Sequence, residues 1–460
     1  MAAEVIVVGG GNAALCAAIT AREAGANVTI LEAAPLYMRG GNSRHTRNLR
    51  VMHREPRAPL VERYETEEYL DDLLRVTGGK SDPGLARLVI ERSEDAFAFL
   101  ARNGVKFQNA LSGTLNLART NAFFLGGGKA LVNALYARAE ALGIAVHYEA
   151  EVEHISIVDG RVAEVVWHRE GQIMHARPAA VVAASGGFQA NLDWLAEVWG
   201  EAAANFSIRG TPYATGKVLR DLIDQGVATV GDPAQCHAVA VDARAPQFDG
   251  GIVTRLDAIP FSIAVNRDGD RFYDEGEDIW PKRYAIWGRL IAQQPRQVAF
   301  SVCDTRATQL FMPSCYPPVI SHTIAGLADA LGLPVERLEK TVSEFNQACS
   351  SSGFDNTRLD GCGTRGISPP KSNWARPIVE PPFVAYPLRP GITFTYLGVQ
   401  VDRAARVRAI DGSAIENLYA AGEIMAGSIL GQGYLAGFGM AIGSVFGTIA
   451  GGKAAVHVAA

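Results

Sequence analysis

The 460-residue sequence lacks the cysteine patterns that hold a metal or a redox cluster. Its six cysteines are scattered, and no CxxC, CxxCH or ferredoxin-like spacing occurs among them. We therefore expect no metal, haem or iron–sulfur site within the chain. Scattered thiols without such a framework are typical of reduced cysteines, so we expect a cytoplasmic protein.

A strong charge imbalance, a signal sequence and a clean membrane span are also absent from the sequence. The formal net charge of −5 and the sequence pI of about 6.0 give no sign of a nucleic-acid partner. No basic segment precedes the apolar strand expected from Glu4, which argues against a signal peptide. Glycines interrupt the apolar run over 430–455, and this pattern predicts a buried helix pressed against backbone or ligand.

Glycine, in contrast, is abundant, with 48 residues that gather in GGG, GG and AGFG runs. The first run follows an apolar strand expected over 4–8. It opens a helix expected over 12–24, which stops at Gly25. A second strand is expected over 27–31. This order of strand, glycine turn, helix and strand predicts a βαβ unit built on a central parallel strand.

The first glycine run has the spacing of a dinucleotide-binding turn. Gly9, Gly11 and Ala14 give the pattern G-x-G-x-x-A. The first glycine permits the turn, and the second lets backbone N–H groups approach a pyrophosphate at the helix N-terminus. Glu32 ends the second strand, where a carboxylate accepts hydrogen bonds from a ribose. The spacing therefore predicts a bound dinucleotide.

Later segments favour FAD over NAD as that dinucleotide. The strand expected over 179–184 ends in Ser185-Gly186-Gly187, and the segment 418–423 ends in Ala-Gly-Glu before a helix of small residues. A flavin lies along the protein and needs several such close backbone approaches. A helix beginning near Leu435 would direct its positive end at the flavin edge and stabilise the reduced flavin.

The middle of the chain differs from its two ends. Between residues 234 and 390, prolines, aromatics and mixed strands dominate, with one clear helix over 335–347. The outer parts keep the alternation of strand, glycine and helix. We therefore predict an α/β protein. Its Rossmann-like FAD-binding domain, residues 1–233 and 391–460, is split by an inserted α+β capping domain, residues 234–390.

Several motifs, taken in order, resemble the flavoproteins of the fumarate reductase and succinate dehydrogenase family. They are the N-terminal dinucleotide unit, Gly40-Gly41-Asn42-Ser43, Gly127-Gly128-Lys129, Ser185-Gly186-Gly187, Asn266-x-x-Gly269-x-Arg271-Phe272 with Asp274-Glu275, and Ala421-Gly422-Glu423. The resemblance implies FAD, a capping domain that closes over the flavin, and hydride exchange between flavin N5 and a carbon next to a carboxylate.

The motifs and the resemblance together assign the residues expected to bind FAD. They are Gly9, Gly11, Asn12, Ala13, Ala14, Glu32, Ala33, Gly40, Gly41, Asn42, Ser43, Gly127, Gly128, Val152, Ala184, Ser185, Gly186, Gly422, Glu423, Gly433, Leu435 and Ala436.

Departures from the family pattern bear on the substrate. The family has an acid and an arginine of a proton relay shortly before the Asn266-x-x-Gly269 turn. Without gaps, Arg255 and Ala258 occupy those positions here. Thr393-Phe394-Thr395-Tyr396 stands where the family has a histidine, and Tyr434 where it has a carboxylate-binding arginine. Fumarate is therefore not the expected substrate. The segments GGNSRHTRN, FYDEGEDIWPKRYAIWGRL, PGITFTYLGV and GYLAGFGMAIG resemble the tricarballylate dehydrogenases instead, which convert a saturated tricarboxylate into cis-aconitate.

The resemblance also implies which residues are catalytic. Arg283 matches the arginine that exchanges a proton with the substrate, and His237 matches a histidine that binds a substrate carboxylate. The Tyr434 hydroxyl is expected to orient a carboxylate. A structural histidine, a surface arginine and a packed aromatic are the alternatives. The sequence leaves open whether Arg283 or Lys282 faces the flavin.

A basic stretch follows the glycine turn of the GGNS motif. We expect Arg44, His45 and Arg47 to form a collar that binds the substrate carboxylates, together with Lys282 and Thr393. Arginine suits this role because its guanidinium pairs with a carboxylate through two hydrogen bonds. A solvated basic loop is the alternative.

His45-Thr46 also resembles the point at which succinate dehydrogenases attach FAD covalently. Those enzymes continue with Gln-Gly-Gly, whereas Asn48-Leu49-Arg50 follows here. We therefore expect FAD to be bound without a covalent link.

These observations predict an FAD-dependent dehydrogenase that acts on CH–CH bonds and oxidises a small polycarboxylate, with tricarballylate as the leading substrate. Reduced FAD would pass its electrons to a separate acceptor, for which a membrane-linked iron–sulfur or haem protein is one candidate. Such a partner would place the protein at the inner membrane. The alternatives are a flavoprotein of cobalamin (precorrin) biosynthesis, a fumarate reductase-like or ketosteroid dehydrogenase-like flavoenzyme, and a non-enzymatic electron-transfer module or flavin sensor.

Overall fold

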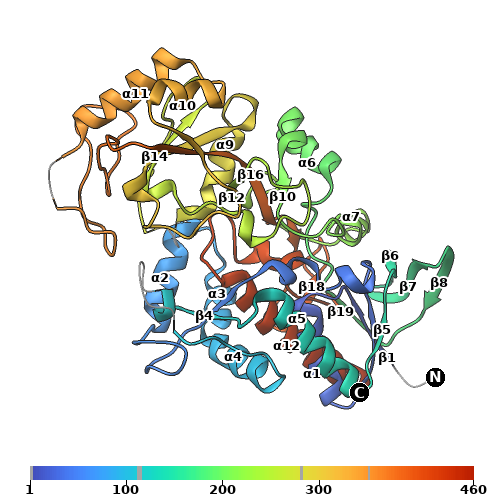
Figure 1. The fold of residues 1–460 in the computed structure, drawn as a ribbon. Helices are drawn as coiled ribbons and strands as arrows, with labels where there is room; N and C mark the ends of the chain where they lie inside the picture. Colours follow the sequence, from blue (N-terminus) through green and yellow to red (C-terminus); the bar gives the residue numbers. More distant parts are fainter. Residues whose placement is uncertain (1–3, 111–116, 280–282, 351–352) are drawn as a thin grey trace.

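The computed structural model describes residues 4–110, 117–279, 283–350 and 353–460. Figure 1 shows two lobes. The lower lobe combines segments from both ends of the chain, coloured blue and red, whereas the upper lobe is built from yellow and orange segments. This arrangement is that of the predicted FAD-binding domain split by an inserted domain.

The lower lobe is organised around a six-stranded sheet with the order β18-β19-β9-β1-β2-β5. All neighbours pair in parallel except β18 and β19, which are antiparallel. Strands from the first and the last part of the chain thus share one sheet. The strands are β1 (Glu4–Val8), β2 (Asn27–Leu31), β5 (Ala145–His147), β9 (Ala180–Ala183), β18 (Arg406–Arg408) and β19 (Ala414–Ala420).

Two helices, α1 (Asn12–Glu23) and α12 (Phe438–Ala459), pack closely against each other beside this sheet. Glycine makes the approach possible, because a Cβ at Gly447 or Gly451 would lie 2.5 Å from Ala13 O or 2.1 Å from Ala17 O. Among the described residues, α12 alone is long and apolar enough to cross a membrane, yet most of it is buried inside the protein. The predicted buried helix is therefore present. It begins at Phe438 rather than near Leu435, because Gly437 takes the left-handed conformation that caps it.

Further elements surround this core of the lower lobe. A three-stranded sheet, β6-β7-β8, projects from it, and short strands pair as β3 with β4 and β11 with β17. These elements are β3 (Asn48–Arg50), α2 (Thr66–Thr77), α3 (Pro83–Glu91), α4 (Ser93–Arg102), β4 (Asn121–Phe123), α5 (Gly127–Ala141), β6 (Glu151–Val158), β7 (Arg161–Arg169), β8 (Gln172–Ala176), α6 (Leu192–Trp199), α7 (Lys217–Asp224), β11 (Thr229–Val230) and β17 (Gly398–Val399).

The upper lobe holds a second sheet, in which β16 (Phe383–Thr395) pairs with β10, β12, β14 and β15. β16 runs through residue 390, so the exact domain boundaries at 234 and 390 stay predictions. The predicted helix over 335–347 is α11. The other elements are β10 (Ser207–Ile208), β12 (Cys236–Asp242), β13 (Ile263–Asn266), α9 (Trp287–Ala292), β14 (Ala299–Asp304), β15 (Val319–Ser321), α10 (Ile324–Leu331) and α11 (Val335–Ala348).

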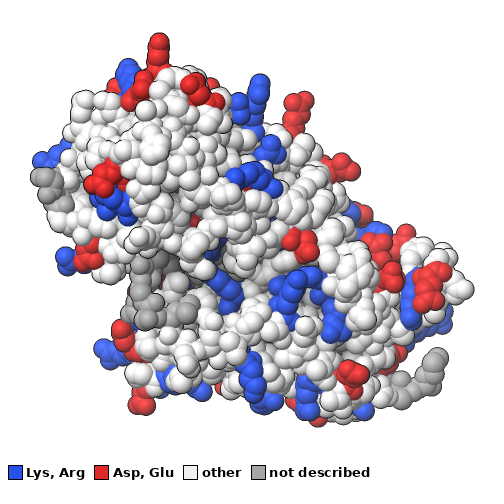
Figure 2. Space-filling model, in the orientation of Figure 1, with Lys and Arg blue, Asp and Glu red and all other residues white. Residues whose placement is uncertain are grey.

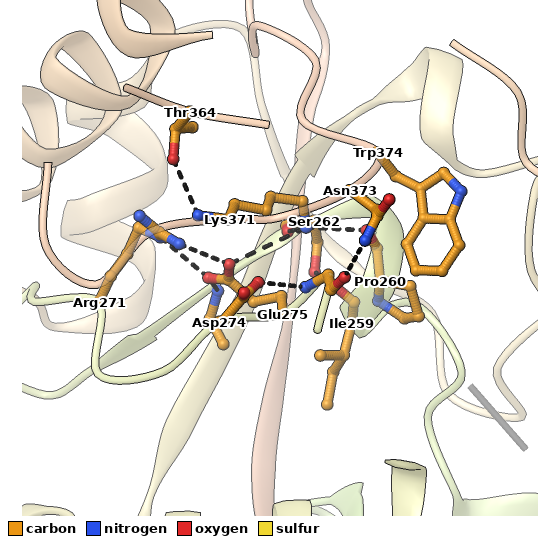
Figure 3. Close-up of polar contacts among 12 residues, drawn as sticks. Ile259, Pro260, Ser262, Arg271, Asp274, Glu275, Thr364, Lys371, Asn373 and Trp374 are labelled. Atoms are coloured by element: carbon orange, nitrogen blue, oxygen red, sulfur yellow. Dashed lines mark hydrogen bonds and ion pairs between the residues drawn. The ribbon is translucent and has the colours of Figure 1, made fainter. Parts of the chain in front are cut away.

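A buried ionic network holds the upper lobe together around the Asn266-x-x-Gly269-x-Arg271 motif (Figure 3). Arg271 donates to both carboxylate oxygens of Glu275, at 3.0 and 2.6 Å. Lys371 is fully buried, and its Nζ donates to the carbonyl oxygens of Pro260 and Ser262 at 2.8 Å each. The network ties the segment after α11 to the strand β13 region. The motif therefore acts by fixing the fold of the upper lobe.

Candidate active site

A cavity of about 1500 Å³, including its open mouth, is lined by residues of both lobes. Glycine-rich strand ends and the first turn of α1 line one end, and arginine, histidine and tyrosine side chains line the other. Figure 2 shows the surface hollowed between the lobes, with Lys and Arg side chains gathered on the lower rim near α5. The cavity thus combines a backbone cradle with a cationic chamber.

The cradle end fits the diphosphate and ribose of FAD. Gly9 has φ +106°, and a Cβ there would lie 2.4 Å from Ala184 O, so only glycine fits this turn. The α1 helix follows an extended Gly11 without a side-chain cap, which leaves backbone N–H groups at its positive end. These features match the predicted pyrophosphate site.

Glu32 gives an independent sign of a ligand at this end. Its Oε1 accepts a hydrogen bond from Ala34 N at 2.9 Å. Its Oε2 is buried with no hydrogen-bond partner among the described residues, and burial raises the pKa of the carboxyl group. A buried carboxylate oxygen without a donor is costly, and a ribose hydroxyl would supply that donor. The residues present therefore fit FAD.

Most of the predicted cofactor residues line this cavity. They are Gly9, Gly11, Asn12, Ala13, Glu32, Ala33, Gly41, Asn42, Ser43, Val152, Ala184, Ser185, Gly186, Gly422, Glu423 and Ala436.

Six predicted cofactor residues lie behind the cavity wall instead. Ala14 and Leu435 are completely buried in the core. A Cβ at Gly128 would lie 2.2 Å from Ser43 O, and one at Gly433 would lie 1.9 Å from Val76 O. Gly40 and Gly127 have positive φ angles, Gly40 in the turn before Gly41 and Gly127 in the turn before Gly128. These residues let neighbouring segments approach and so support the cradle from outside.

Asn42 and Glu423 hold the two lobes together where the cradle meets the chamber. The Asn42 side chain accepts from Thr211 N at 2.9 Å and donates to Thr393 O at 2.6 Å. The Glu423 carboxylate accepts from Thr395 N at 2.9 Å. Burial raises the pKa of Glu423 to about 7, although these hydrogen bonds work against the shift. Both side chains therefore join the flavin loops to the end of β16.

The chamber is lined by three arginines, Arg47, Arg209 and Arg255. Arg255 donates to Asp257 at 2.7 Å, so its charge is offset locally. Burial and the charge of Arg255 lower the pKa of both Arg47 and Arg209 to about 10. A buried arginine remains charged at neutral pH even so. The chamber therefore has more positive than negative charge.

His237 and the aromatic residues complete the chamber. The His237 ring stacks on Tyr434, with centroids 3.9 Å apart, and meets the Tyr284 ring edge-on at 5.5 Å. Neither ring nitrogen of His237 has a hydrogen-bond partner among the described residues. Burial, together with Arg209 and Arg255, lowers the pKa of His237 well below its usual value. The imidazole is thus neutral and able to donate one hydrogen bond to a ligand.

The predicted collar is only partly assembled at this cavity. Arg47 and His45 line it, as does Thr393, whose hydroxyl is buried without a hydrogen-bond partner among the described residues. Arg44 lies outside the lining and donates to Tyr37 O at 3.1 Å.

Asp249 of the upper lobe is the acidic partner that Arg44 has outside the cavity. Its carboxylate lies 2.5 Å from His45 Nε2 and 3.7 Å from Arg44 Nε. Burial lowers the pKa of His45 to about 4, although Asp249 works against the shift. The charge of Arg44 is thus matched within the protein instead of being presented to a ligand.

Arg283 also lies outside the residues that line the cavity. Its guanidinium contacts Glu277 at 2.5 Å and donates to the Tyr273 hydroxyl at 2.7 Å. Burial alone would lower the pKa of Arg283, but Glu277 and Tyr273 raise it overall. The next residue, Tyr284, is the one that faces the cavity. Lys282 lies outside the described residues.

The sequence did not point to Arg209 or to Tyr284. Arg209 belongs to no motif, and its position depends on strands that are distant in the sequence. Tyr284 directly follows the predicted Arg283, and of these two residues only Tyr284 lines the cavity.

Comparison with known proteins shows the family to which the chain is similar. The sequence profile of the family described as "FAD binding domain" matches residues 4–439. The chain is 27% identical to the probable fumarate reductase Ifc3 of Shewanella frigidimarina, covering 99% of this chain and 75% of the relative. It is 26% identical to the NADH:fumarate oxidoreductase of Klebsiella pneumoniae, covering 98% of this chain and 47% of the relative, so it spans about half that protein.

Solved structures share the same fold. The open conformation of a flavocytochrome c3 fumarate reductase superposes with a TM-score of 0.76 at 24% identity, covering 99% of this chain and 78% of the other. The 3-ketosteroid-Δ4-(5α)-dehydrogenase of Rhodococcus jostii RHA1 gives 0.75 at 22% identity, covering 98% and 96%. The predicted fold class is confirmed.

Proposed function

We propose that this chain, a member of the FAD binding domain family and an FAD-dependent oxidoreductase that acts on CH–CH bonds, uses a small polycarboxylate as its substrate, with tricarballylate as the leading candidate. One observation carries the proposal. The chamber beside the FAD cradle holds three arginines, and among the described residues only Arg255 of the three forms an ion pair with a carboxylate.

The energetics of buried charge favour an anionic ligand in this chamber. A guanidinium removed from water without a counter-ion costs several kcal/mol. A carboxylate relieves that cost through paired, charge-assisted hydrogen bonds. A substrate with several carboxylates would engage several of these groups together, whereas an apolar substrate such as a steroid would leave them unmatched. The chamber therefore supports the polycarboxylate reading over the ketosteroid alternative.

Each residue of the chamber has a proposed role in the reaction. When bound, FAD takes up or supplies the hydride. His237 and Thr393 donate hydrogen bonds to a substrate carboxylate, because each has a buried polar atom without a partner among the described residues. Tyr284 is placed to exchange the proton, since its ring lies under the Arg255 guanidinium, 4.8 Å from it, and against His237. In the direction of dehydrogenation, Tyr284 would take the proton as its phenolate; burial raises the pKa of this phenol, and the charges of Arg255, Arg209 and Arg47 work against that shift.

The acceptor of the electrons is part of the same proposal. A separate redox protein would receive them, as expected from the sequence. The curated relatives include proteins called fumarate reductase (cytochrome) and NADH:fumarate oxidoreductase, and both are longer than this chain. A membrane-linked partner and a cytoplasmic location stay predictions.

Turnover by the purified, FAD-loaded protein tests the proposal. Tricarballylate and an artificial electron acceptor should give cis-aconitate, and the flavin absorbance should bleach when the acceptor is left out. A flavin that stays oxidised with tricarballylate, citrate and succinate alike would sink the polycarboxylate assignment. Fumarate with a reduced dye tests the fumarate reductase alternative, which predicts faster turnover in that direction.

The mode of FAD attachment is tested with the same preparation. Acid precipitation should give a colourless pellet and a yellow supernatant, because His45 lies against Asp249 and the Gln-Gly-Gly of the covalent enzymes is absent. A pellet that stays yellow after washing would show a covalent link.

A further inference from the structure

Arg209 occupies a fixed position at the end of β10, next to the end of β16. Its backbone N–H donates to Ile392 O at 2.9 Å, and its carbonyl accepts from Gly251 N, also at 2.9 Å. A Cβ at the following residue, Gly210, would lie 1.9 Å from Asn42 Oδ1. These contacts fix the backbone position from which the Arg209 side chain enters the chamber.

The Arg209 side chain is buried, and two of its three guanidinium nitrogens lack a hydrogen-bond partner in the part of the chain that the structure describes. The residue is only 5% exposed, and it lines the chamber together with His237 and Tyr434. Its Nε and Nη1 atoms have no hydrogen-bond partner among the described residues. Buried guanidinium groups are normally paired, because an unpaired one costs several kcal/mol. The position therefore indicates a ligand.

The charges around Arg209 determine what kind of ligand fits. Arg255 is its strongest electrostatic neighbour, and this charge together with burial lowers the pKa of Arg209 to about 10. Asp257 is engaged by Arg255 at 2.7 Å. The remaining neighbours, Tyr284 and Tyr434, are neutral phenols at physiological pH. The ligand must therefore be an anion.

The diphosphate of FAD is not the anion that Arg209 indicates. The diphosphate cradle is built by Gly9, Gly11 and the first turn of α1, with Glu32 on its far side. None of those residues is among the charged or polar neighbours of Arg209, which all belong to the chamber. A carboxylate of the substrate is the anion that the chamber would receive.

We propose that Arg209 determines specificity by binding the carboxylate that distinguishes a tricarboxylate from a dicarboxylate of the same main chain. The inference rests on the proposed function and makes it narrower. Arg255 already pairs with Asp257, so the chamber offers a trianion three places for its carboxylates: Arg47, Arg209, and the pair of His237 and Thr393. A dicarboxylate leaves one of these three places without an anion, and Nε and Nη1 of Arg209 have no other hydrogen-bond partner among the described residues.

Binding to the FAD-loaded protein tests this assignment without turnover. Tricarballylate is compared with glutarate, which has the same main chain without the middle carboxylate, by isothermal titration. We expect wild-type protein to bind tricarballylate about 100-fold more tightly than glutarate, because one more buried ion pair forms. Arg209→Met should weaken tricarballylate binding about 100-fold and bring the two dissociation constants close together.

Two matched variants control the interpretation. Arg177→Met removes an arginine whose side chain is 85% exposed, and it should leave both affinities unchanged. Arg209→Lys keeps the charge but loses the paired hydrogen bonds, and it should weaken tricarballylate by about tenfold only. If Arg209→Met does not fold, the expected loss in Arg209→Lys tests the same proposal.

Thermal stability gives a readout that a merely structural residue would not produce. Because Arg209 is an unpaired buried charge without substrate, Arg209→Met should keep or raise the melting temperature of the substrate-free protein. The rise in melting temperature that tricarballylate causes in wild-type protein should be lost in the variant.

The outcomes separate this inference from the proposed function. If wild-type protein binds none of these carboxylates, the proposed function fails. If wild-type protein prefers tricarballylate and Arg209→Met keeps that preference, the role of Arg209 is wrong while the proposed function stands. An equal loss of both affinities, or a loss of FAD content, would also overturn the role in selectivity.

Discussion

The imidazole of His237 and the phenol ring of Tyr434 stack with their centroids 3.9 Å apart and their planes within 5° of parallel. His237 belongs to β12 in the upper lobe, and Tyr434 lies in the loop before α12 in the lower lobe. The Tyr434 hydroxyl in turn accepts a hydrogen bond from Gly439 N at 3.0 Å, in the first turn of α12. The two lobes are thus joined by a ring contact at the site itself.

His237→Asn should weaken substrate binding while FAD stays bound. The variant loses the ring that is placed to donate to a substrate carboxylate, and hydrogen bonds to charged groups contribute about 1.5–3 kcal/mol. We therefore expect the KM for tricarballylate to rise at least tenfold, about 1.4 kcal/mol, measured by steady-state kinetics. Tyr434→Phe keeps the stacked ring and should change KM less. An unchanged KM in His237→Asn would show that this histidine has a structural role and does not bind the substrate.

Tyr284→Phe should lower turnover more than Arg283→Gln does. Tyr284 lines the cavity, whereas Arg283 is engaged by Glu277 and Tyr273 outside it. Loss of a proton-exchanging group commonly costs about 100-fold or more in rate. We expect a loss of that size in kcat for Tyr284→Phe with a nearly unchanged KM. If Arg283→Gln shows the larger loss instead, the arginine implied by the family resemblance is the proton-exchanging residue.

Glu423 should make the FAD-free protein less stable as the pH rises from 4.5 to 7. Burial raises the pKa of Glu423 from 4.5 to about 7, so the folded state binds more protons than the unfolded state over this range. The contribution of Glu423 to stability is therefore present below pH 4.5 and lost as the pH rises through about 7.

The difference between wild-type protein and Glu423→Gln isolates this effect. The glutamine keeps the shape and an acceptor for Thr395 N but does not titrate. Melting temperatures measured across the range should fall more steeply with rising pH for wild-type protein than for the variant. Parallel curves would contradict the raised pKa of Glu423.

Asp72→Asn should destabilise the lower lobe strongly. Asp72 is the carboxylate that faces Arg50, which is 1% exposed, at 3.3 Å, and it also accepts from the Tyr64 hydroxyl at 3.0 Å. Without that charge, the buried guanidinium would be unmatched, which typically costs about 3–5 kcal/mol. Urea unfolding measures the loss.

Arg75 offers the matched control for this prediction. It pairs with the same Asp72 at 3.4 Å, but its side chain is 51% exposed. Arg75→Gln should cost less than about 1 kcal/mol, as exposed ion pairs do. Equal losses in Arg75→Gln and Asp72→Asn would show that burial of Arg50 does not control the effect.

Local patterns predicted the FAD cradle well, because its chemistry resides in adjacent residues. Gly9 and Gly11 are placed by a turn between one strand and one helix, and Glu32 by the end of the next strand. The position of each depends on its immediate neighbours, which a single sequence displays. The same holds for the glycines that let α12 approach α1.

The chamber was less accessible to prediction, because its geometry depends on contacts between distant segments. The sequence predicted Arg44 as a substrate ligand, but the fold brings Asp249, which is distant in the sequence, next to Arg44. Arg209 is held by Ile392 and Gly251, neither of which shares a motif with it. A basic stretch in the sequence shows where positively charged residues are concentrated. The fold determines which of these side chains have an acidic partner.

The pairing of β12 with β16 contains an irregularity that constrains how this site can change. His237 is paired with Phe394 and Ala238 with Ile392, so Thr393 is an extra residue in β16. Thr395, two residues further along β16, donates its backbone N–H to Glu423. Removing one residue here would restore strict alternation and turn Phe394 to the opposite face of the strand. The number of residues at this edge therefore decides which face of β16 each following side chain takes.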